Sequence, residues 1–213
     1  MPPTDVIDAL AGIEPDSALD RLRSRRPESR THAQGSYDAL FAPADTAHAS
    51  LAERAAVATF VASLHWQDSA VAHYRSLLAQ EDERLVPSVL DLAERAVALA
   101  PEGPYGDFVG ENAPESVPGP RFAVTDLAAT YVLGDRLTAA LEHAHLLPLP
   151  PRDAAPADLQ RLEDAGWSAT GIVTLSQLVA FLAFQLRVVA GLRALQDARA
   201  AVGTASTTEG AGR

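Results

Sequence analysis

The stretch SLAERAAVATFVASLHWQDSAVAHYRSLL, residues 50–78, decides the fold class. It opens with Ser50 and Glu53 in the spacing of a capping box, in which each side chain accepts a hydrogen bond from the backbone N–H of the other residue. Asp68 can cap a second helix after the first. Apolar residues recur at intervals of three and four along both segments, at Val57, Phe60, Val61 and Leu64 and then at Val71, Tyr74, Leu77 and Leu78. This spacing predicts two successive amphipathic helices.

The same periodicity dominates the rest of the chain. Helical segments are predicted over residues 4–10, 16–26, 28–41, 88–100, 125–145, 158–165 and 168–200. β-Branched residues are sparse, and no segment alternates polar and apolar residues as a strand does. We therefore expect an all-α fold with three parts, namely an N-terminal helical extension (1–44), a main helical domain (45–200) and a disordered tail (201–213).

Residues 101–120, PEGPYGDFVGENAPESVPGP, interrupt the helices with glycine and proline. A stretch of this length without regular structure is usually functional or a linker when it lies inside a domain. Two interpretations stay open for it, an arm or lid on the one hand and irregular coil on the other.

The composition excludes several kinds of chemistry. Among 213 residues there is no cysteine, which excludes disulfides, thiolate nucleophiles and cysteine-ligated metal centres. All 17 basic residues are arginine, so a Schiff-base lysine and a P-loop lysine are excluded too. The formal net charge of −11 argues against binding to nucleic acid or to an anionic membrane surface.

From the sequence we expect no membrane-spanning helix and no secretion signal. No apolar run reaches the roughly 20 residues that a spanning helix needs. The first residues, MPPTD, lack the basic and apolar regions of a signal peptide. We expect a soluble, cytoplasmic protein.

Two distant segments resemble each other. Residues 60–77, FVASLHWQDSAVAHYRSL, and residues 178–195, LVAFLAFQLRVVAGLRAL, are identical at eight positions without a gap. The pairs are Val61/Val179, Ala62/Ala180, Leu64/Leu182, Gln67/Gln185, Val71/Val189, Ala72/Ala190, Arg75/Arg193 and Leu77/Leu195. One interpretation is an internally duplicated helical hairpin, and the other is two amphipathic helices of similar composition.

With SLAER opening one helix and AVAHY on the next, the sequence resembles the alkylhydroperoxidase D (AhpD)-like, or carboxymuconolactone decarboxylase, superfamily. The stretch LEDAGWSATGIVTLSQLVAFLAFQLRVVAGLRAL, residues 162–195, is similar to the C-terminal part of the peroxidase-related branch. The likeness covers roughly residues 45–200. It implies an all-α AhpD-like domain with an internal duplication, assembled as a homo-oligomer.

The peroxidase members of that superfamily carry Cys-x-x-Cys-x-x-x-His. If His73 is the motif histidine, the two former thiol positions are Trp66 and Ser69. An anchor on the Ser50 cap moves both positions one residue along, and both thiols are absent either way. A thiol peroxidase acts by thiolate attack and disulfide formation, so the resemblance does not imply that activity here.

The decarboxylase branch of the superfamily resembles general acid–base enzymes that act on a lactone acid without thiols. This resemblance leaves Glu53, His65 and His73 as candidate catalytic groups, if folding brings them together. Arg187 and Tyr74 are expected near a pocket. Each candidate also has a structural interpretation: Glu53 as the capping carboxylate, His65 as a residue favoured at a helix C-terminus, and His73 as a core-edge residue.

Two functional hypotheses follow. The first is a peroxidase-related or decarboxylase-like enzyme without a thiol. The second is a non-catalytic module that binds a small apolar ligand or a partner enzyme of an oxidoreductase system. A pocket with perturbed titratable groups would favour the enzyme, and an apolar pocket without them the binding module. We expect no cofactor and no metal, because His143 and His145 point about 200° apart on a helix.

Overall fold

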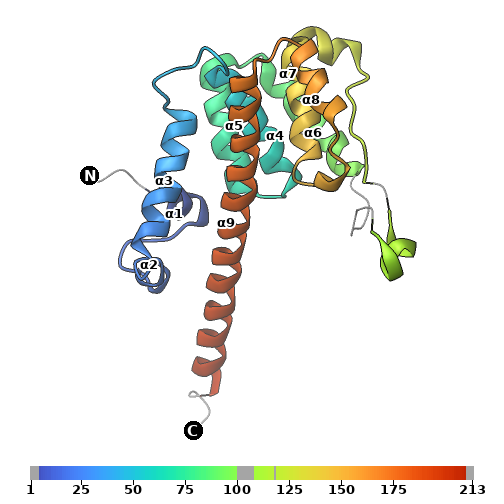
Figure 1. Cartoon of the computed structure of the whole chain (residues 1–213). Coiled ribbons are helices and arrows are strands. Elements are labelled where there is room, and N and C mark those ends of the chain that lie inside the picture. The colour runs from blue at the N-terminus through green and yellow to red at the C-terminus, as the bar shows by residue number, and fades with distance from the viewer. Residues whose placement is uncertain (1–4, 100–107, 118, 210–213) are drawn as a thin grey trace.

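Figure 1 presents the computed structural model of the chain, which describes residues 5–99, 108–117 and 119–209. Every regular element within these ranges is a helix, so the predicted all-α class is confirmed. The α-helices are α1 (Val6–Ala11), α2 (Ala18–Arg23), α3 (Pro27–Phe41), α4 (Leu51–Leu64), α5 (Asp68–Asp82), α6 (Leu85–Ala98), α7 (Leu127–Leu146), α8 (Pro156–Asp164) and α9 (Ala169–Glu209). Two short 3₁₀ helices, η1 (Gly110–Glu115) and η2 (Pro151–Asp153), lie between them.

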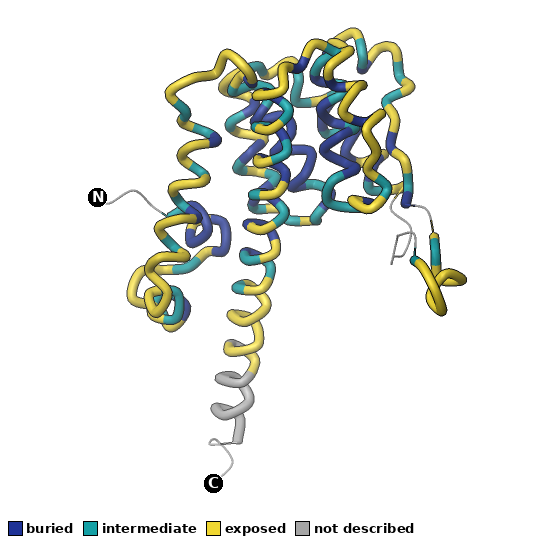
Figure 2. Tube along the Cα trace, in the orientation of Figure 1, coloured by how far each residue is buried: buried dark blue, intermediate teal, exposed yellow. Residues whose placement is uncertain are grey.

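Helix α4 is the centre of the core. Every residue from 55 to 62 along it is buried, and α5, α6, α7 and α9 pack around it. Figure 2 shows the buried residues concentrated in this part of the molecule. A helix that is apolar or small on all sides is stable only when it is enclosed in this way.

The capping box predicted at the start of α4 is present. Ser50 Oγ accepts from the Glu53 N–H at 3.2 Å, and Glu53 Oε2 accepts from the Ser50 N–H at 2.8 Å. The sequence predicts that Asp68 caps the next helix, but α5 begins at Asp68 itself and Gln67 occupies the N-cap position. Trp66 adopts a φ of 51° between the two helices, which turns the chain there.

The predicted internal duplication is not confirmed. Residues 60–77 cross the turn between α4 and α5, whereas residues 178–195 lie inside the uninterrupted helix α9. The two segments share apolar positions, but only the first contains a helix end. Similar composition on two amphipathic helices therefore accounts for the likeness.

Helix α9 is longer than the sequence predicted. Its first half packs against α4, and its second half projects from the body (Figure 1). It continues past residue 200 to Glu209, so this part of the predicted disordered tail is helical. The segment is rich in alanine and contains no proline, and a single glycine is not enough to end a helix.

The span from Ala169 to Arg199 in α9 is also long and apolar enough to cross a membrane. This differs from the expectation that no run would qualify. Of its apolar window, 44% is buried inside the protein, and the core helix of a soluble protein can have the same length and composition. The finding is therefore weak support for a span.

The N-terminal extension is part of the packed body. Ile7 and Leu10 of α1 are buried in the same core as α4, and α1 lies against α9 and α5. Gly12 ends α1 in the left-handed conformation, with a φ of 69°, which glycine adopts without steric strain. Helices α2 and α3 follow on the outer side of α1 (Figure 1).

Residues 108–117, within the predicted loop 101–120, form a segment that we call the arm. The Phe108 N–H donates to Ser116 Oγ at 2.9 Å, which closes the arm at its base. The Phe108 ring lies 4.8 Å from the Arg152 guanidinium, and this contact holds the base on the body. Residues 101–107 and 118 of the predicted loop lie outside the described residues.

Buried histidines make the fold sensitive to acid. Burial lowers the pKa of His65, His73 and His143, and it lowers the pKa of His145 to about 4. The His145 side chain packs on the Phe122 ring, and its Nε2 atom is buried without a hydrogen-bond partner among the described residues. A charged imidazolium is therefore disfavoured at this position.

We expect the free energy of unfolding to fall as the pH drops below 6.5, and the contribution of His145 to level off near pH 4. In this window the unfolded chain binds protons that the folded chain does not. Between pH 7 and pH 5 this histidine alone should cost about 2 kcal/mol. Urea denaturation at pH 7 and pH 5 measures this. The decrease in the free energy of unfolding between the two pH values should be smaller for His145→Leu than for the wild type. For His32→Gln, a control at an exposed position, it should equal that of the wild type. Equal wild-type stability at both values would contradict this account.

Candidate ligand-binding groove

The structure does not bring the three predicted catalytic residues together. Glu53 lies in the first turn of α4, and His65 is the C-cap residue of the same helix. Twelve residues of α-helix separate their backbones by about 18 Å. His73 lies on α5, after the turn. Glu53 therefore cannot share a reaction centre with His65.

Glu53 takes part in a structural junction. Its Oε1 atom accepts from Arg136 Nε at 2.5 Å, in addition to its role in the capping box. The Arg136 guanidinium lies 3.9 Å from the Trp167 ring and donates to the carbonyls of Gly166 and His48. These contacts join α4, α7 and the turn between α8 and α9.

His65 and Arg187 are neighbours at the edge of the body. His65 shares a hydrogen bond with the Val61 carbonyl at 2.9 Å. Burial lowers its pKa, and the positive charge of Arg187 acts in the same direction. Arg187 is exposed, and its Nη1 donates to the Ala183 carbonyl. Burial and the Arg187 charge thus favour the neutral imidazole, and no carboxylate of the described residues contacts either side chain.

The two former thiol positions have unrelated surroundings. Trp66 is 70% exposed at the turn before α5. Ser69 donates its hydroxyl to the Leu10 carbonyl at 2.8 Å, which attaches α5 to α1. Neither position therefore retains a feature that would serve a redox pair.

His73 and Tyr74 belong to a packed aromatic cluster between α3, α5 and α9. His73 Nε2 lies 2.8 Å from the Tyr37 hydroxyl, and the Tyr74 hydroxyl donates to Gln185 Oε1 at 2.5 Å. The Phe41 ring lies 4.9 Å from Tyr37 and 5.1 Å from Tyr74. Burial raises the pKa of Tyr74, so this hydroxyl stays protonated. None of these side chains lines the groove described next.

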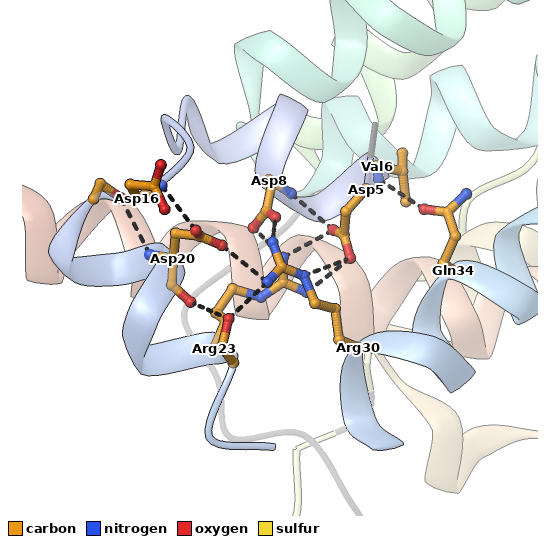
Figure 3. Close-up of polar contacts among 10 residues, drawn as sticks. Asp5, Val6, Asp8, Asp16, Asp20, Arg23, Arg30 and Gln34 are labelled. Carbon is orange, nitrogen blue, oxygen red and sulfur yellow. Dashed lines mark hydrogen bonds and ion pairs between the residues drawn. The ribbon is translucent and has the colours of Figure 1, made fainter. Parts of the chain in front are cut away.

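A network of carboxylates and arginines joins the first three helices (Figure 3). Asp8 of α1 accepts from both Arg23 of α2 and Arg30 of α3. Asp5 accepts from Arg23 Nη1 at 2.8 Å and lies 3.4 Å from Arg30 Nε. Asp20 pairs with Arg30 at 2.9 Å. Three carboxylates thus neutralise two guanidinium groups, of which Arg23 is largely buried.

These helices form one wall of a groove, and α9 forms the other wall. The groove has a volume of about 610 Å³. Its apolar lining comes from Ile7, Leu22 and Ala33 on the first wall and from Phe184, Val188 and Leu192 on α9. Residues four apart along a helix share one face, so the three α9 side chains form a continuous strip.

Arginines give the groove a positive side. Arg23, Arg25, Arg26 and Arg30 all line it. Arg23 and Arg30 are neutralised by the carboxylates of the network. The exposed side chains of Arg25 and Arg26 have no carboxylate partner within the described part of the chain. The groove is therefore a local positive site on a protein of net charge −11.

The lining determines the kind of chemistry that the groove supports. Among the described residues, no histidine, aspartate or glutamate lines it. Arginine stays protonated in proteins, so the arginines can bind an anion but cannot exchange a proton with it. The volume lies in the range of sites for small organic molecules. These properties fit binding of an apolar ligand with an anionic group.

The net charge of the whole chain, −11, conceals this local positive site. A local signal was present in RLRSRRPESR, residues 21–30, where five of the 17 arginines occur. Sequence alone could not show which of the five would be neutralised. Comparison with protein-family models and with characterised proteins gives no match for this chain.

We expect Asp8→Asn to lower the free energy of unfolding by about 1–3 kcal/mol, because it removes the buried carboxylate that both guanidinium groups share, while Asp5 and Asp20 still pair with them. Urea denaturation at pH 7 measures the change. Asp91→Asn is the matched control, since Asp91 forms an exposed pair with Arg95 and should cost less than about 1 kcal/mol. Equal losses for the two variants would refute a central role of Asp8.

Proposed function

We propose that this chain is a non-catalytic binding module whose groove takes a small amphipathic anion, namely an apolar body carrying a carboxylate or a similar group. The observation that carries the proposal is the position of Arg25 and Arg26. Both line an apolar groove, and neither has a carboxylate partner among the described residues. An anionic ligand would supply that partner.

Two forces would contribute to affinity. The apolar body would bury surface against the α9 strip of Phe184, Val188 and Leu192, at about 25 cal/mol per Å². The anionic group would accept charge-assisted hydrogen bonds from the guanidinium of Arg25 or Arg26, and guanidinium binds carboxylate with two parallel bonds. Because Phe184 is 45% exposed, the ligand would cover apolar surface that is otherwise in contact with water.

Isothermal titration calorimetry with decanoate tests the proposal. We expect the wild type to bind decanoate and to bind decanol, the uncharged analogue of equal chain length, at least about tenfold more weakly, since a charged hydrogen bond contributes about 1.5–3 kcal/mol. The double variant Arg25→Gln/Arg26→Gln should lose a similar factor for decanoate and none for decanol.

Arg75→Gln is the matched control, because Arg75 is exposed on α5 and does not line the groove. It should bind decanoate as the wild type does. Leu192→Asp tests the apolar wall and should weaken the binding of both ligands. Equal affinity of the wild type and the Arg25/Arg26 variant for decanoate would reject the proposal.

A second candidate is a homo-oligomeric AhpD-like enzyme that works without thiols. It is supported by the sequence resemblance and by the hydrogen bond between His73 and Tyr37. Burial lowers the pKa of His73, which favours the neutral form that a general base needs.

Even in that role the protein should not consume an organic hydroperoxide when a dithiol is the electron donor, because the chain contains no cysteine. An assay that couples hydroperoxide consumption to oxidation of the dithiol, with protein that a chelator has freed of metal, measures this. Robust dithiol-linked turnover would show that a thiol-free route exists and would remove the main distinction from the peroxidases.

A further inference from the structure

The chain contains a segment whose chemistry matches the groove. The arm, residues 108–117, carries Glu111 and Glu115 and no basic residue. Both glutamates are exposed, and Val109 beside them is 87% exposed. An apolar side chain next to two carboxylates is the same combination that the groove would recognise in a small amphipathic anion.

The arm is held in a defined shape at its base. The Ser116 hydroxyl bonds both the N–H and the carbonyl of Phe108, at 2.9 Å and 3.3 Å. The Phe108 ring packs under Arg152. Val109 and the glutamates are thereby presented by a closed loop, which reduces the conformational entropy lost when the arm binds.

The arm does not lie near the groove of its own chain. Figure 1 shows the arm on the right of α9 and helices α1, α2 and α3, which form one groove wall, on the left. A contact between arm and groove therefore requires a second copy of the chain.

We infer that the arm of a second copy docks in the groove, with Val109 against the apolar strip of α9 and the two glutamates paired with Arg25 and Arg26. Each copy has one arm and one groove, so two copies can exchange arms around a twofold axis and leave neither site open. The inference rests on the proposed function, since it uses the same groove, and it adds regulation: the arm competes with the small anion.

The charges on the two surfaces favour this partner. The formal net charge of −11 repels two copies from each other over most of their surfaces. The Arg25 and Arg26 pair is a positive site that attracts an acidic segment at short range. Since the second arm docks within an already formed pair, its effective concentration is high and two modest contacts act together. The dimer should therefore weaken as salt screens these charges.

A charge-swap experiment by analytical ultracentrifugation tests the inference. We expect the wild type to be a dimer and two variants, Arg25→Glu/Arg26→Glu and Glu111→Arg/Glu115→Arg, each to be monomeric. A 1:1 mixture of the two variants should form a heterodimer, because each arm then meets a groove of opposite charge. Glu81→Arg/Glu83→Arg, at exposed positions near the end of α5, is the matched control and should remain a dimer.

A monomeric wild type, or a dimer that survives both variants, would overturn the inference. Loss of the dimer in the groove variant alone would also overturn it, because the arm would then not be the occupant. The mixture guards against misfolding, since a misfolded variant could not restore a dimer.

Decanoate separates this inference from the proposed function. If the arm competes, decanoate should dissociate the wild-type dimer. The variant Glu111→Gln/Glu115→Gln should also bind decanoate more tightly than the wild type. If one groove in ten is free in the wild type, for example, its apparent affinity should be about tenfold lower than that of the variant. Equal binding by a monomeric wild type and this variant rejects the arm contact alone. No binding by either protein rejects the proposed function.

Discussion

The position of the first groove wall depends on the ion pairs of the Asp8 carboxylate. This carboxylate accepts from Arg23 and Arg30 at once and Asp8 is 7% exposed, so one residue of α1 fixes both α2 and α3. Helix α1 is itself anchored, because Ile7 and Leu10 are buried in the common core. The position of the first wall, and with it the end of α2 that leads into Arg25 and Arg26, follows from this arrangement.

Helix α9 connects the core with the groove. Leu182 and Leu186 are buried against the body, whereas Phe184 and Val188, on the other face, line the groove. A single helix can serve both purposes because its side chains point in different directions every few residues. The predicted catalytic residues lie elsewhere, in contacts that stabilise helix ends and helix packing. A binding role is therefore supported by the groove. An acid–base role is supported by the hydrogen bond between His73 and Tyr37.

Local signals allowed the fold class to be predicted from the sequence, and tertiary contacts explain what could not be. Ser50 and Glu53 are three residues apart, so their capping box depends only on the α4 segment that contains them. The internal duplication is not confirmed, since shared apolar positions do not reveal where a helix ends. The groove depends on which arginines meet Asp5, Asp8 and Asp20, and this pairing joins residues up to 25 positions apart. No local pattern contains that information.

Hydrogen–deuterium exchange with and without decanoate tests the central claim that ligand binding occurs between the N-terminal helices and α9. The account predicts slower exchange in residues 22–33 and 184–192, which form the two walls, and little change in residues 53–74. Protection confined to residues 53–74, which contain Glu53, His65 and His73, would contradict it and would return the functional site to the core helices.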